Sequence, residues 1–505
     1  MADPSELQVR GGIGGVQALL EDVDRAGLLL RTAAGELADH ARAVLAVSGD
    51  PGLQRTAALS PLTFARAEAA LAGAALGRGG LFALAARTEG LSLGALTAAR
   101  GYRIADDAVT GTLQAAASRL GQAIGMAGGV LAPVLFPVPA VVVSVLARRD
   151  AGGSSAASPR TQLEPLRRIS GVLLRWLADH PTATGVAAPV LSGVIGGFWA
   201  TVPGGPLITA SVLSRPGEPA TVAEIANGLQ AFGGPAGAVT GGPRWLCDQR
   251  QFRVRVAAAP RYQPPRDLAG LLGRIPGETD HPSVHVERID SATGRRWVVS
   301  VPGTADWSPV ASRTPFDLTG DVRLLAAGRS TGTAAVMAAM RATGVRPGEP
   351  VLLVGHSQGG LIAAAVAADP MVRREFAISH VLTSGAPVAS VPVPDQVQVL
   401  SIEHTDDLVP RLDGSANRDR PNWVTVSTAA PTTELPAADR AEPLAAHRLE
   451  LYRRTAQRID ESSDPSIVRW RAGLAPFLDR ASGPNSVGVG SGAGWDVEIT
   501  RADAS

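Results

Sequence analysis

A serine, an aspartate and a histidine in the second half of the chain could together perform acyl transfer. Ser357 lies in the pattern Gly-x-Ser-x-Gly, between Gly355 and Gly359. A serine hydroxyl at its ordinary pKa is a poor nucleophile, so it needs a general base, which is oriented in turn by an acid. Asp407 and His447 follow Ser357 along the chain and could supply that acid and that base.

The surroundings of Ser357 distinguish it from two other serines in the same pattern. Gly-x-Ser-x-Gly occurs at Gly90–Gly94, Gly328–Gly332 and Gly355–Gly359, and a chain with 57 glycines produces such matches by chance. We expect Ser92 between two helices and Ser330 inside a helix. Ser357 instead follows the apolar run Val351–Val354 and precedes a predicted helix over Gly359–Ala368. Strand, tight turn and helix are what a nucleophile elbow requires.

The base and the acid are chosen by their order in the chain. His447 is the single histidine downstream of the strand predicted over Gln398–Glu403. The acid should follow that strand closely, and this position alone does not distinguish Asp407 from the alternatives Asp406 and Glu403.

Two further histidines lie near these candidates. His404 precedes the acid, in the wrong order for a base, and we expect it to be an ordinary loop residue. His356 is expected to be structural, packed beside the elbow at the start of the helix.

These motifs resemble those of the class 3 lipases, a group of α/β-hydrolases, over about residues 284–455. The matching features are Gly355-His356-Ser357-Gln358-Gly359-Gly360, Asp-x-Val-Pro at Asp407–Pro410, and His447 five residues before Tyr452. The Gly-His-Ser-x-Gly-Gly turn is also similar to that of the GPI inositol-deacylase group. The resemblance implies an α/β-hydrolase fold and hydrolysis of a carboxylic ester, with no metal or organic cofactor. It does not select the ester, which could be a lipid, a polyester or a small molecule.

The resemblance also implies an oxyanion hole. In that family an apolar strand ending in Gly-Thr or Gly-Ser supplies half of it, and Val298–Thr304 matches, with Pro302 where the lipases often carry arginine. The backbone N–H groups of Thr304 and Gln358, with the Thr304 hydroxyl, would then bind the tetrahedral oxyanion. Trp307 could line an acyl pocket or simply pack. The segment Arg266–Ile275 could be a lid or a plain surface helix.

The order of predicted elements indicates an α/β fold with a mainly parallel sheet, preceded by an all-α region. A strand is predicted at Phe252–Val256 and a hairpin at Ser283–Ile289 and Trp297–Val301. Further helices are predicted at Asp321–Thr343 and Ile467–Ala481, a strand at His380–Ser384 and a final strand at Trp495–Thr500. We therefore expect the chain to have four parts. They are residues 1–120 (helical bundle), 121–240 (apolar, Gly/Pro-rich helices), 245–482 (hydrolase) and 483–505 (Gly-rich tail).

The N-terminal helices offer a hypothesis about export. A predicted helix-turn-helix ends in Tyr102-x-x-x-Asp106, which resembles the signal of WXG-type proteins exported by type VII (ESX) systems of actinobacteria. Residues 122–147 and 181–214 lack ionisable side chains and are long enough to span a bilayer, although frequent prolines oppose a continuous helix. Membrane association of this region is therefore an alternative.

Composition excludes some classes of protein. The chain has 505 residues, a formal net charge of +1 and arginine but no lysine, and this alanine-rich usage resembles that of a high-GC actinobacterial genome. No polybasic arm favours a nucleic-acid partner, and one cysteine, Cys247, excludes internal disulfides. No secretory signal peptide is visible.

We expect an ester or lipid substrate, with the type VII machinery and a membrane as further partners. The expected location is the envelope, secreted or membrane-associated, with a cytoplasmic one as the remaining alternative. The alternatives to an enzyme are an inactive exported interaction protein on a hydrolase scaffold and a membrane-anchored envelope protein.

Overall fold

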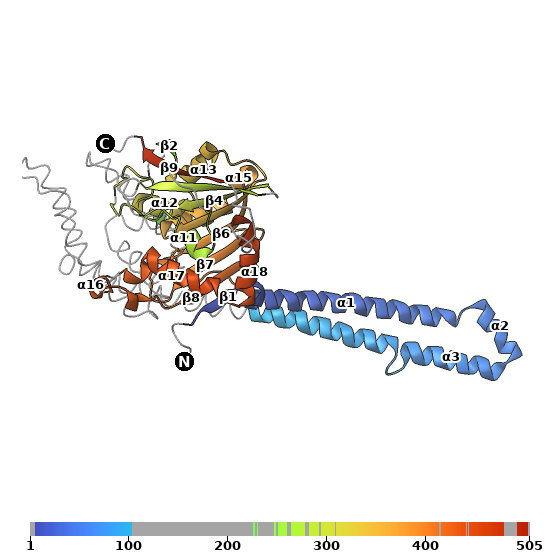
Figure 1. The fold of residues 1–505 in the computed structure, drawn as a ribbon. Coiled ribbons are helices and arrows are strands. Elements are labelled where there is room, and N and C mark those ends of the chain that lie inside the picture. The colour runs from blue at the N-terminus through green and yellow to red at the C-terminus, as the bar shows by residue number, and fades with distance from the viewer. Residues whose placement is uncertain are drawn as a thin grey trace, which may run out of the picture. The chain divides into compact units, whose positions relative to one another are not determined.

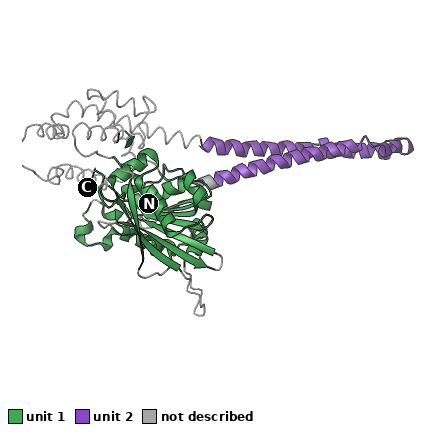
Figure 2. Ribbon diagram, turned by 90° about the horizontal axis from the view of Figure 1, so that it is seen from above, with its two compact units in different colours: residues 1–14, 113–505 green, residues 15–112 purple. Residues whose placement is uncertain are grey.

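The chain divides into two compact units (Figure 2), residues 1–14 with 113–505 and residues 15–112. The structure is a computed structural model that describes residues 6–103, 226–227, 230, 247–248, 251–259, 264–277, 282–291, 294–308, 310–413, 416–440, 442, 444–478 and 492–502. The apolar stretches 122–147 and 181–214, and Asp106 of the export pattern, lie outside these residues.

In the first unit, the described residues form one sheet of nine strands in the order β1-β8-β7-β6-β5-β4-β3-β9-β2 (Figure 1). The strands are β1 (Gln8–Gly11), β2 (Phe252–Ala258), β3 (Ser283–Ser291), β4 (Gly294–Val301), β5 (Pro350–His356), β6 (Ala377–Ser384), β7 (Gln398–His404), β8 (Trp423–Thr428) and β9 (Gly492–Arg501). Strands β4 to β8 are parallel, whereas β1, β3, β9 and β2 pair antiparallel at the two sides. The loops that follow β4, β5 and β7 therefore open at the same edge.

Helices cover both faces of this sheet. They are α11 (Leu268–Leu272), α12 (Leu318–Ala327), α13 (Thr331–Thr343), α14 (Gln358–Ala368), α15 (Pro370–Glu375), α16 (Ala437–Arg440), α17 (Leu449–Asp460) and α18 (Pro465–Leu474), with 3-10 turns η1 (Gly12–Gly14), η2 (Val409–Arg411), η3 (Thr432–Glu434), η4 (Ala445–His447) and η5 (Ala475–Phe477). Alternate residues of β5 enter two cores: Val351 and Leu353 pack with α12, α13 and α14, and Leu352 and Val354 with α11, α17 and α18. An apolar strand buried on both faces is typical of a parallel sheet between helices.

The predicted α/β architecture is confirmed, and the fold is of the α/β-hydrolase type. The hairpin of β3 and β4 turns at Gly294, whose φ of +111° is one that L side chains rarely adopt. The single helix predicted over Asp321–Thr343 is wrong. The structure has two helices, because α12 ends at left-handed Gly328 (φ 64°) and Ser330 begins α13 with a capping box to Thr333.

Both ends of the described chain contribute strands that change the predicted organisation. Residues 8–11 were predicted within an all-helical region, but they form β1 and pair with β8. The final strand was predicted inside a separate tail, yet β9 lies between β3 and β2 in the sheet. The helix predicted over Ile467–Ala481 stops at Leu474, where a 3-10 turn containing Pro476 follows. Strand β8 was not predicted.

The second unit is a helical hairpin. Its helices are α1 (Val16–Val47), α2 (Pro51–Leu59), α3 (Pro61–Leu76) and a further helix over residues 81–103. Ser92 lies within that last helix and not between helices, and its buried hydroxyl donates to the Gly27 carbonyl at 2.7 Å. The chain reverses around α2, and α3 and the helix over residues 81–103 both run back along α1, separated by a turn at residues 77–80 (Figure 1).

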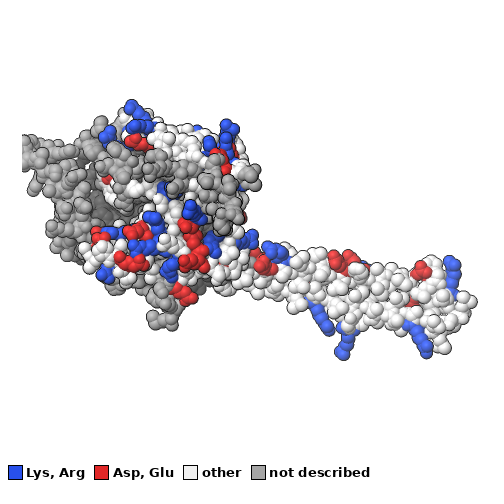
Figure 3. Space-filling model, in the orientation of Figure 1, with Lys and Arg blue, Asp and Glu red and all other residues white. Residues whose placement is uncertain are grey.

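The face of the hairpin that Figure 3 shows has large areas without Lys, Arg, Asp or Glu between its scattered charged side chains. The buried hydrophobic residues of the hairpin are alanines, namely Ala34, Ala41, Ala75, Ala85 and Ala99, whereas leucines such as Leu29 and Leu62 are exposed. Among the described residues, one helical segment, Pro61–Arg103, which includes the turn at residues 77–80, is long and apolar enough to cross a membrane by length and composition. That property is compatible with a membrane-associated or envelope location.

Candidate active site

Ser357 occupies a strained turn between β5 and α14. Its φ of 56° and ψ of −127° make it the single residue other than glycine with a positive φ among the described residues. Its N–H donates to the Ser384 carbonyl at 3.0 Å, which anchors the turn to the end of β6. Backbone strain of this kind costs of order 1–3 kcal/mol and concentrates at functional sites.

The glycines of the elbow are required by close backbone contacts. A Cβ on Gly355 would lie 2.2 Å from the Gly359 carbonyl carbon, and one on Gly359 would lie 2.2 Å from the Val301 carbonyl oxygen. A Cβ on Gly360 would lie 2.6 Å from that of Ala386. Without side chains here, α14 begins directly against the ends of β4 and β6, and the turn that carries Ser357 can form.

His447 and Asp407 are held together by a short hydrogen bond. Nδ1 of His447, in η4, lies 2.6 Å from Oδ2 of Asp407, in the loop after β7, and both side chains are buried. Burial opposes ionisation of Asp407, but the histidine and the hydrogen bonds it accepts outweigh this and lower its pKa. The buried Nε2 of His447 has no hydrogen-bond partner within the described part of the chain. An imidazole oriented through Nδ1 with a free Nε2 is suited to accept a proton from a nucleophile.

The other two carboxylates considered for this position point elsewhere. Asp406 Oδ1 accepts the Ala430 N–H at 2.8 Å. Glu403 is bound by the side-chain amide of Asn417, and burial raises its pKa to about 7. Of the three acids, Asp407 is therefore the one that the structure places on His447.

Tyr452 and His404 hold the Asp407 carboxylate in position. The Tyr452 hydroxyl donates to Asp407 Oδ2 at 2.7 Å and accepts the His404 N–H at 3.2 Å, and the His404 and Tyr452 rings stack with centroids 3.8 Å apart. His404 was expected to be a loop residue, which is wrong. It ends β7, is buried, and contacts the Ala446 carbonyl and the Thr455 hydroxyl at 2.8 and 2.9 Å. It thereby fixes the turn that presents His447.

The elbow and the histidine loop lie side by side. The ring of His356, adjacent to Ser357, has its centroid 4.6 Å from that of His447. A Cβ on Gly385, next to the Ser384 carbonyl that anchors Ser357, would lie 3.0 Å from His447 Cε1. His356 is buried, and its Nδ1 contacts the Ser384 carbonyl. Its pKa is lowered to about 3, mainly by burial and secondly by the charge of the nearby His447. It is a neutral packing residue of the site.

The segment after β4 also lies beside Ser357. A Cβ on Gly303 would lie 3.5 Å from that of Ser357, so Thr304 follows at the edge of the site. The Thr304 hydroxyl donates to Asp321 Oδ2 at 3.0 Å. Burial is the main cause that raises the pKa of Asp321 to about 8; the Thr304 and Gln358 hydrogen bonds oppose it, and Asp317 adds to it. The Gln358 side chain donates to the Asp317 carbonyl at 2.9 Å, and its backbone N–H, at the first position of α14, has no carbonyl one turn earlier.

The remaining expectations around the site are resolved as follows. Trp307 is 56% exposed, so it does not pack in the core. The lid or surface helix over Arg266–Ile275 is wrong: α11 buries Leu268 and Leu272 completely, and its Leu268 N–H donates to Asp460 of α17 at 3.0 Å. An amphipathic pattern with leucines on one face does not distinguish a lid from a helix docked on a sheet.

The chain has an α/β-hydrolase fold with a serine elbow and a paired histidine and aspartate. A family model described as the PGAP1-like alpha/beta domain matches residues 334–436, which include the elbow and Asp407. That family belongs to the α/β-hydrolase superfamily. No curated protein matches the chain significantly, and no solved structure does. Among the described residues, no group of three His, Cys, Asp or Glu side chains could hold a metal ion.

Proposed function

We propose that the protein hydrolyses carboxylic esters with Ser357 as nucleophile, through an acyl-enzyme. The observation that carries the proposal is the geometry of His447: it is oriented by Asp407 at 2.6 Å, its Nε2 is buried without a partner, and it borders the strained elbow. A scaffold without activity has no need for this arrangement.

Each residue then has a defined role. Ser357 Oγ attacks the acyl carbonyl while His447 Nε2 takes its proton, and Asp407 stabilises the imidazolium. The oxyanion is bound by the backbone N–H groups of Gln358 and Thr304, each such donor being worth about 2.7–4 kcal/mol. His447 next protonates the leaving alkoxide. Water, deprotonated by the same imidazole, then releases the acid.

Hydrolysis of p-nitrophenyl esters from acetate to palmitate tests the proposal. Wild-type protein should be active, and Ser357→Ala should lose activity, on the order of 10⁶-fold. Ser92→Ala is the matched control, because Ser92 lies in the same sequence pattern but in the helical hairpin. Equal activity of wild type and Ser357→Ala would exclude Ser357 as nucleophile. Equal inertness would favour the inactive interaction protein.

We further propose an envelope location, supported by the long apolar helix within Pro61–Arg103. Export by a type VII system is a proposal that rests on the pattern begun by Tyr102, which is exposed at the end of the described helix. Cell fractionation tests the location: recovery of the protein only in the cytosol would contradict it.

A further inference from the structure

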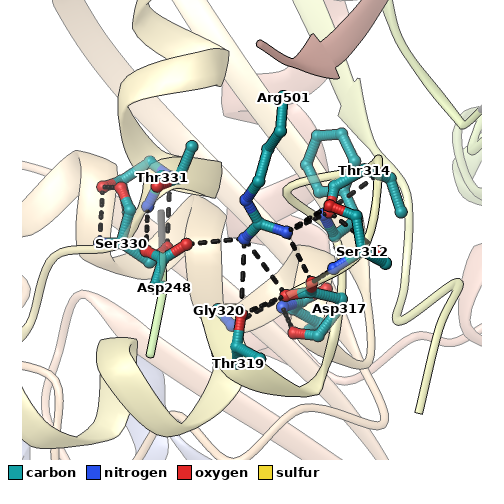
Figure 4. A network of polar contacts seen from close by, with 12 residues as sticks. Asp248, Ser312, Thr314, Asp317, Thr319, Gly320, Ser330, Thr331 and Arg501 are labelled. Atoms are coloured by element: carbon teal, nitrogen blue, oxygen red, sulfur yellow. Dashed lines mark hydrogen bonds and ion pairs between the residues drawn. The ribbon is translucent and has the colours of Figure 1, made fainter. Parts of the chain in front are cut away.

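A buried arginine near the C-terminal end of β9 contacts the loop that leads from Thr304 to α12. The Arg501 side chain is completely buried between the carboxylates of Asp317 and Asp248, which are 0% and 2% exposed (Figure 4). Its Nη2 lies 2.6 Å from Asp248 Oδ1 and 3.2 Å from Asp317 Oδ1. Nη1 donates to Asp317 Oδ2 and to the carbonyls of Ser312, at 3.0 Å, and Thr314.

This arrangement is an expensive way to stabilise a fold. Removing three charges from water carries a solvation penalty, and apolar residues of the same volume often stabilise a protein as well or better. The gain from a guanidinium is geometric, because its rigid donors fix several acceptors in one plane. Arg501 therefore defines where Asp317 and the two carbonyls lie, and Asp248 extends the contact to the start of α13 by accepting the Thr331 N–H at 2.6 Å.

Two backbone hydrogen bonds join the start and the end of the loop held by Arg501, between residues 305 and 318. The Ala305 N–H donates to the Phe316 carbonyl at 2.8 Å, and the Leu318 N–H donates to the Asp306 carbonyl at 2.9 Å. Thr304 directly precedes the first of these bonds. The placement of its backbone N–H thus depends on the loop between 305 and 318.

Asp317 connects this loop to both proposed oxyanion donors. Its carbonyl accepts the side-chain amide of Gln358 at 2.9 Å. Its carboxylate also caps α12, accepting the Gly320 N–H at 2.9 Å, and the next residue of α12, Asp321, accepts the Thr304 hydroxyl.

We infer that Arg501 is a positioning residue for the oxyanion side of the site, acting through Asp317 on Thr304 and Gln358. The inference rests on the proposed ester hydrolysis. Strand β9, which carries Arg501, would then contribute to the reaction without contacting the substrate.

The test compares full-length wild type with Arg501→Met, Arg501→Lys and a control, Arg341→Met. Arg341, in the last turn of α13, forms an exposed two-point ion pair with Glu375 in α15 and has no contact with Arg501 among the described interactions. Amide hydrogen exchange of Ala305 and Leu318, measured against the amides of β5, reports on the loop without requiring activity. Hydrolysis of p-nitrophenyl butyrate is measured per site labelled by a fluorophosphonate, so that an unfolded fraction does not count.

In Arg501→Met we expect loop amides to exchange at least tenfold faster while β5 stays protected. We expect kcat per labelled site to fall about 10- to 100-fold with KM little changed, as for a catalytic group misplaced by an ångström. Arg501→Lys keeps the positive charge but lacks the planar guanidinium with its rigid donors. It should show both effects and remain folded, which makes it the deciding variant if Arg501→Met does not fold. Arg341→Met should change neither quantity.

Unchanged loop exchange in a folded Arg501 variant would overturn the inference, and so would unchanged kcat per labelled site. If wild type neither hydrolyses esters nor is labelled at Ser357, the proposed function fails. The exchange of Ala305 and Leu318 then still decides whether Arg501 holds the loop.

Discussion

The pKa of Asp321 leads to a prediction about alkaline pH. Since burial raises this pKa to about 8, the carboxyl is neutral in roughly nine molecules of ten at pH 7 and ionised in roughly nine of ten at pH 9. Its oxygen lies 3.0 Å from the Thr304 hydroxyl. An oxyanion bound by the backbone N–H groups of Thr304 and Gln358, and about 3 Å from the Thr304 hydroxyl oxygen, would be about 6 Å from the carboxylate.

The magnitude follows from Coulomb's law. Two negative charges about 6 Å apart repel by about 2.8 kcal/mol at an effective dielectric constant of about 20, which is roughly a hundredfold in rate. Ionised Asp321 would also accept the Thr304 hydroxyl more strongly, but a hydrogen bond to a charged group gains only about 1 kcal/mol over a neutral one. Repulsion therefore dominates, and kcat/KM should fall above pH 8.

The assay is the pH profile of p-nitrophenyl butyrate hydrolysis from pH 6 to 10, corrected for spontaneous hydrolysis. Asp321→Asn keeps the shape but cannot ionise, so its profile should lose the alkaline limb. Asp395→Asn, at a side chain that is 84% exposed, is the matched control and should keep it. An alkaline limb that persists in Asp321→Asn, or a wild-type profile that stays flat to pH 10, would refute the reasoning.

The same group makes stability depend on pH. The unfolded chain loses the Asp321 proton near its ordinary pKa of 3.8, whereas the folded protein keeps it to about 8. The folded state binds more protons in this window, so stability falls as pH rises through it. Asp321→Asn should therefore have the higher Tm at pH 8, and the difference should vanish below pH 4.

Three further substitutions test the geometry of the site. Tyr452→Phe removes the 2.7 Å hydrogen bond to Asp407, so the free energy of unfolding measured by calorimetry should fall by about 1.5–3 kcal/mol. The acid limb of the profile of kcat/KM against pH should move to higher pH. Unchanged values would mean that the hydroxyl does not stabilise the carboxylate. Gly385→Ala places a Cβ 3.0 Å from the ring of His447 at a φ of +59°, so kcat should fall, whereas Gly344→Ala, at a φ of +86° in open space, should cost stability alone. Ser357→Gly should be about 1 kcal/mol more stable to urea than Ser357→Ala, because glycine relieves the positive φ; equal stabilities would contradict the proposed strain.

Local patterns account for the parts that could be predicted from the sequence. The elbow at Ser357 combines an apolar strand, a tight turn and a helix within a few residues, and chain order selects His447 as the base. Position alone left Asp406, Asp407 and Glu403 open as the acid, and the structure places Asp407 on His447. The helix break at Gly328 was missed, although residues 328–333 contain no apolar side chain and Gly328 and Ser330 are a typical pair of helix end and helix start signals.

Contacts between distant segments could not be predicted in this way. Strand β1 is four residues long, and nothing in Gln8–Gly11 indicates that its partner is Val424–Ser427. Arg501 pairs with residues 184 and 253 positions away, and a lone charged residue in a sequence looks the same whether it is buried or exposed. The burial of His404 likewise depends on α17, which packs against β7 only in the folded chain.

The position of β9 in the sheet has a consequence for synthesis. Strands β2 and β3 leave the ribosome long before Gly492, yet both hydrogen-bond to β9 in the finished sheet and not to each other. Until β9 is made, β2 has no partner and β3 presents a free edge, which in other proteins invites aggregation. The helical hairpin can form early from contacts close in sequence, whereas the sheet can close only once β9 has been made, and pairing of segments so distant in sequence is slow. We therefore expect nascent chains of this protein to depend on a chaperone until residue 501 has emerged.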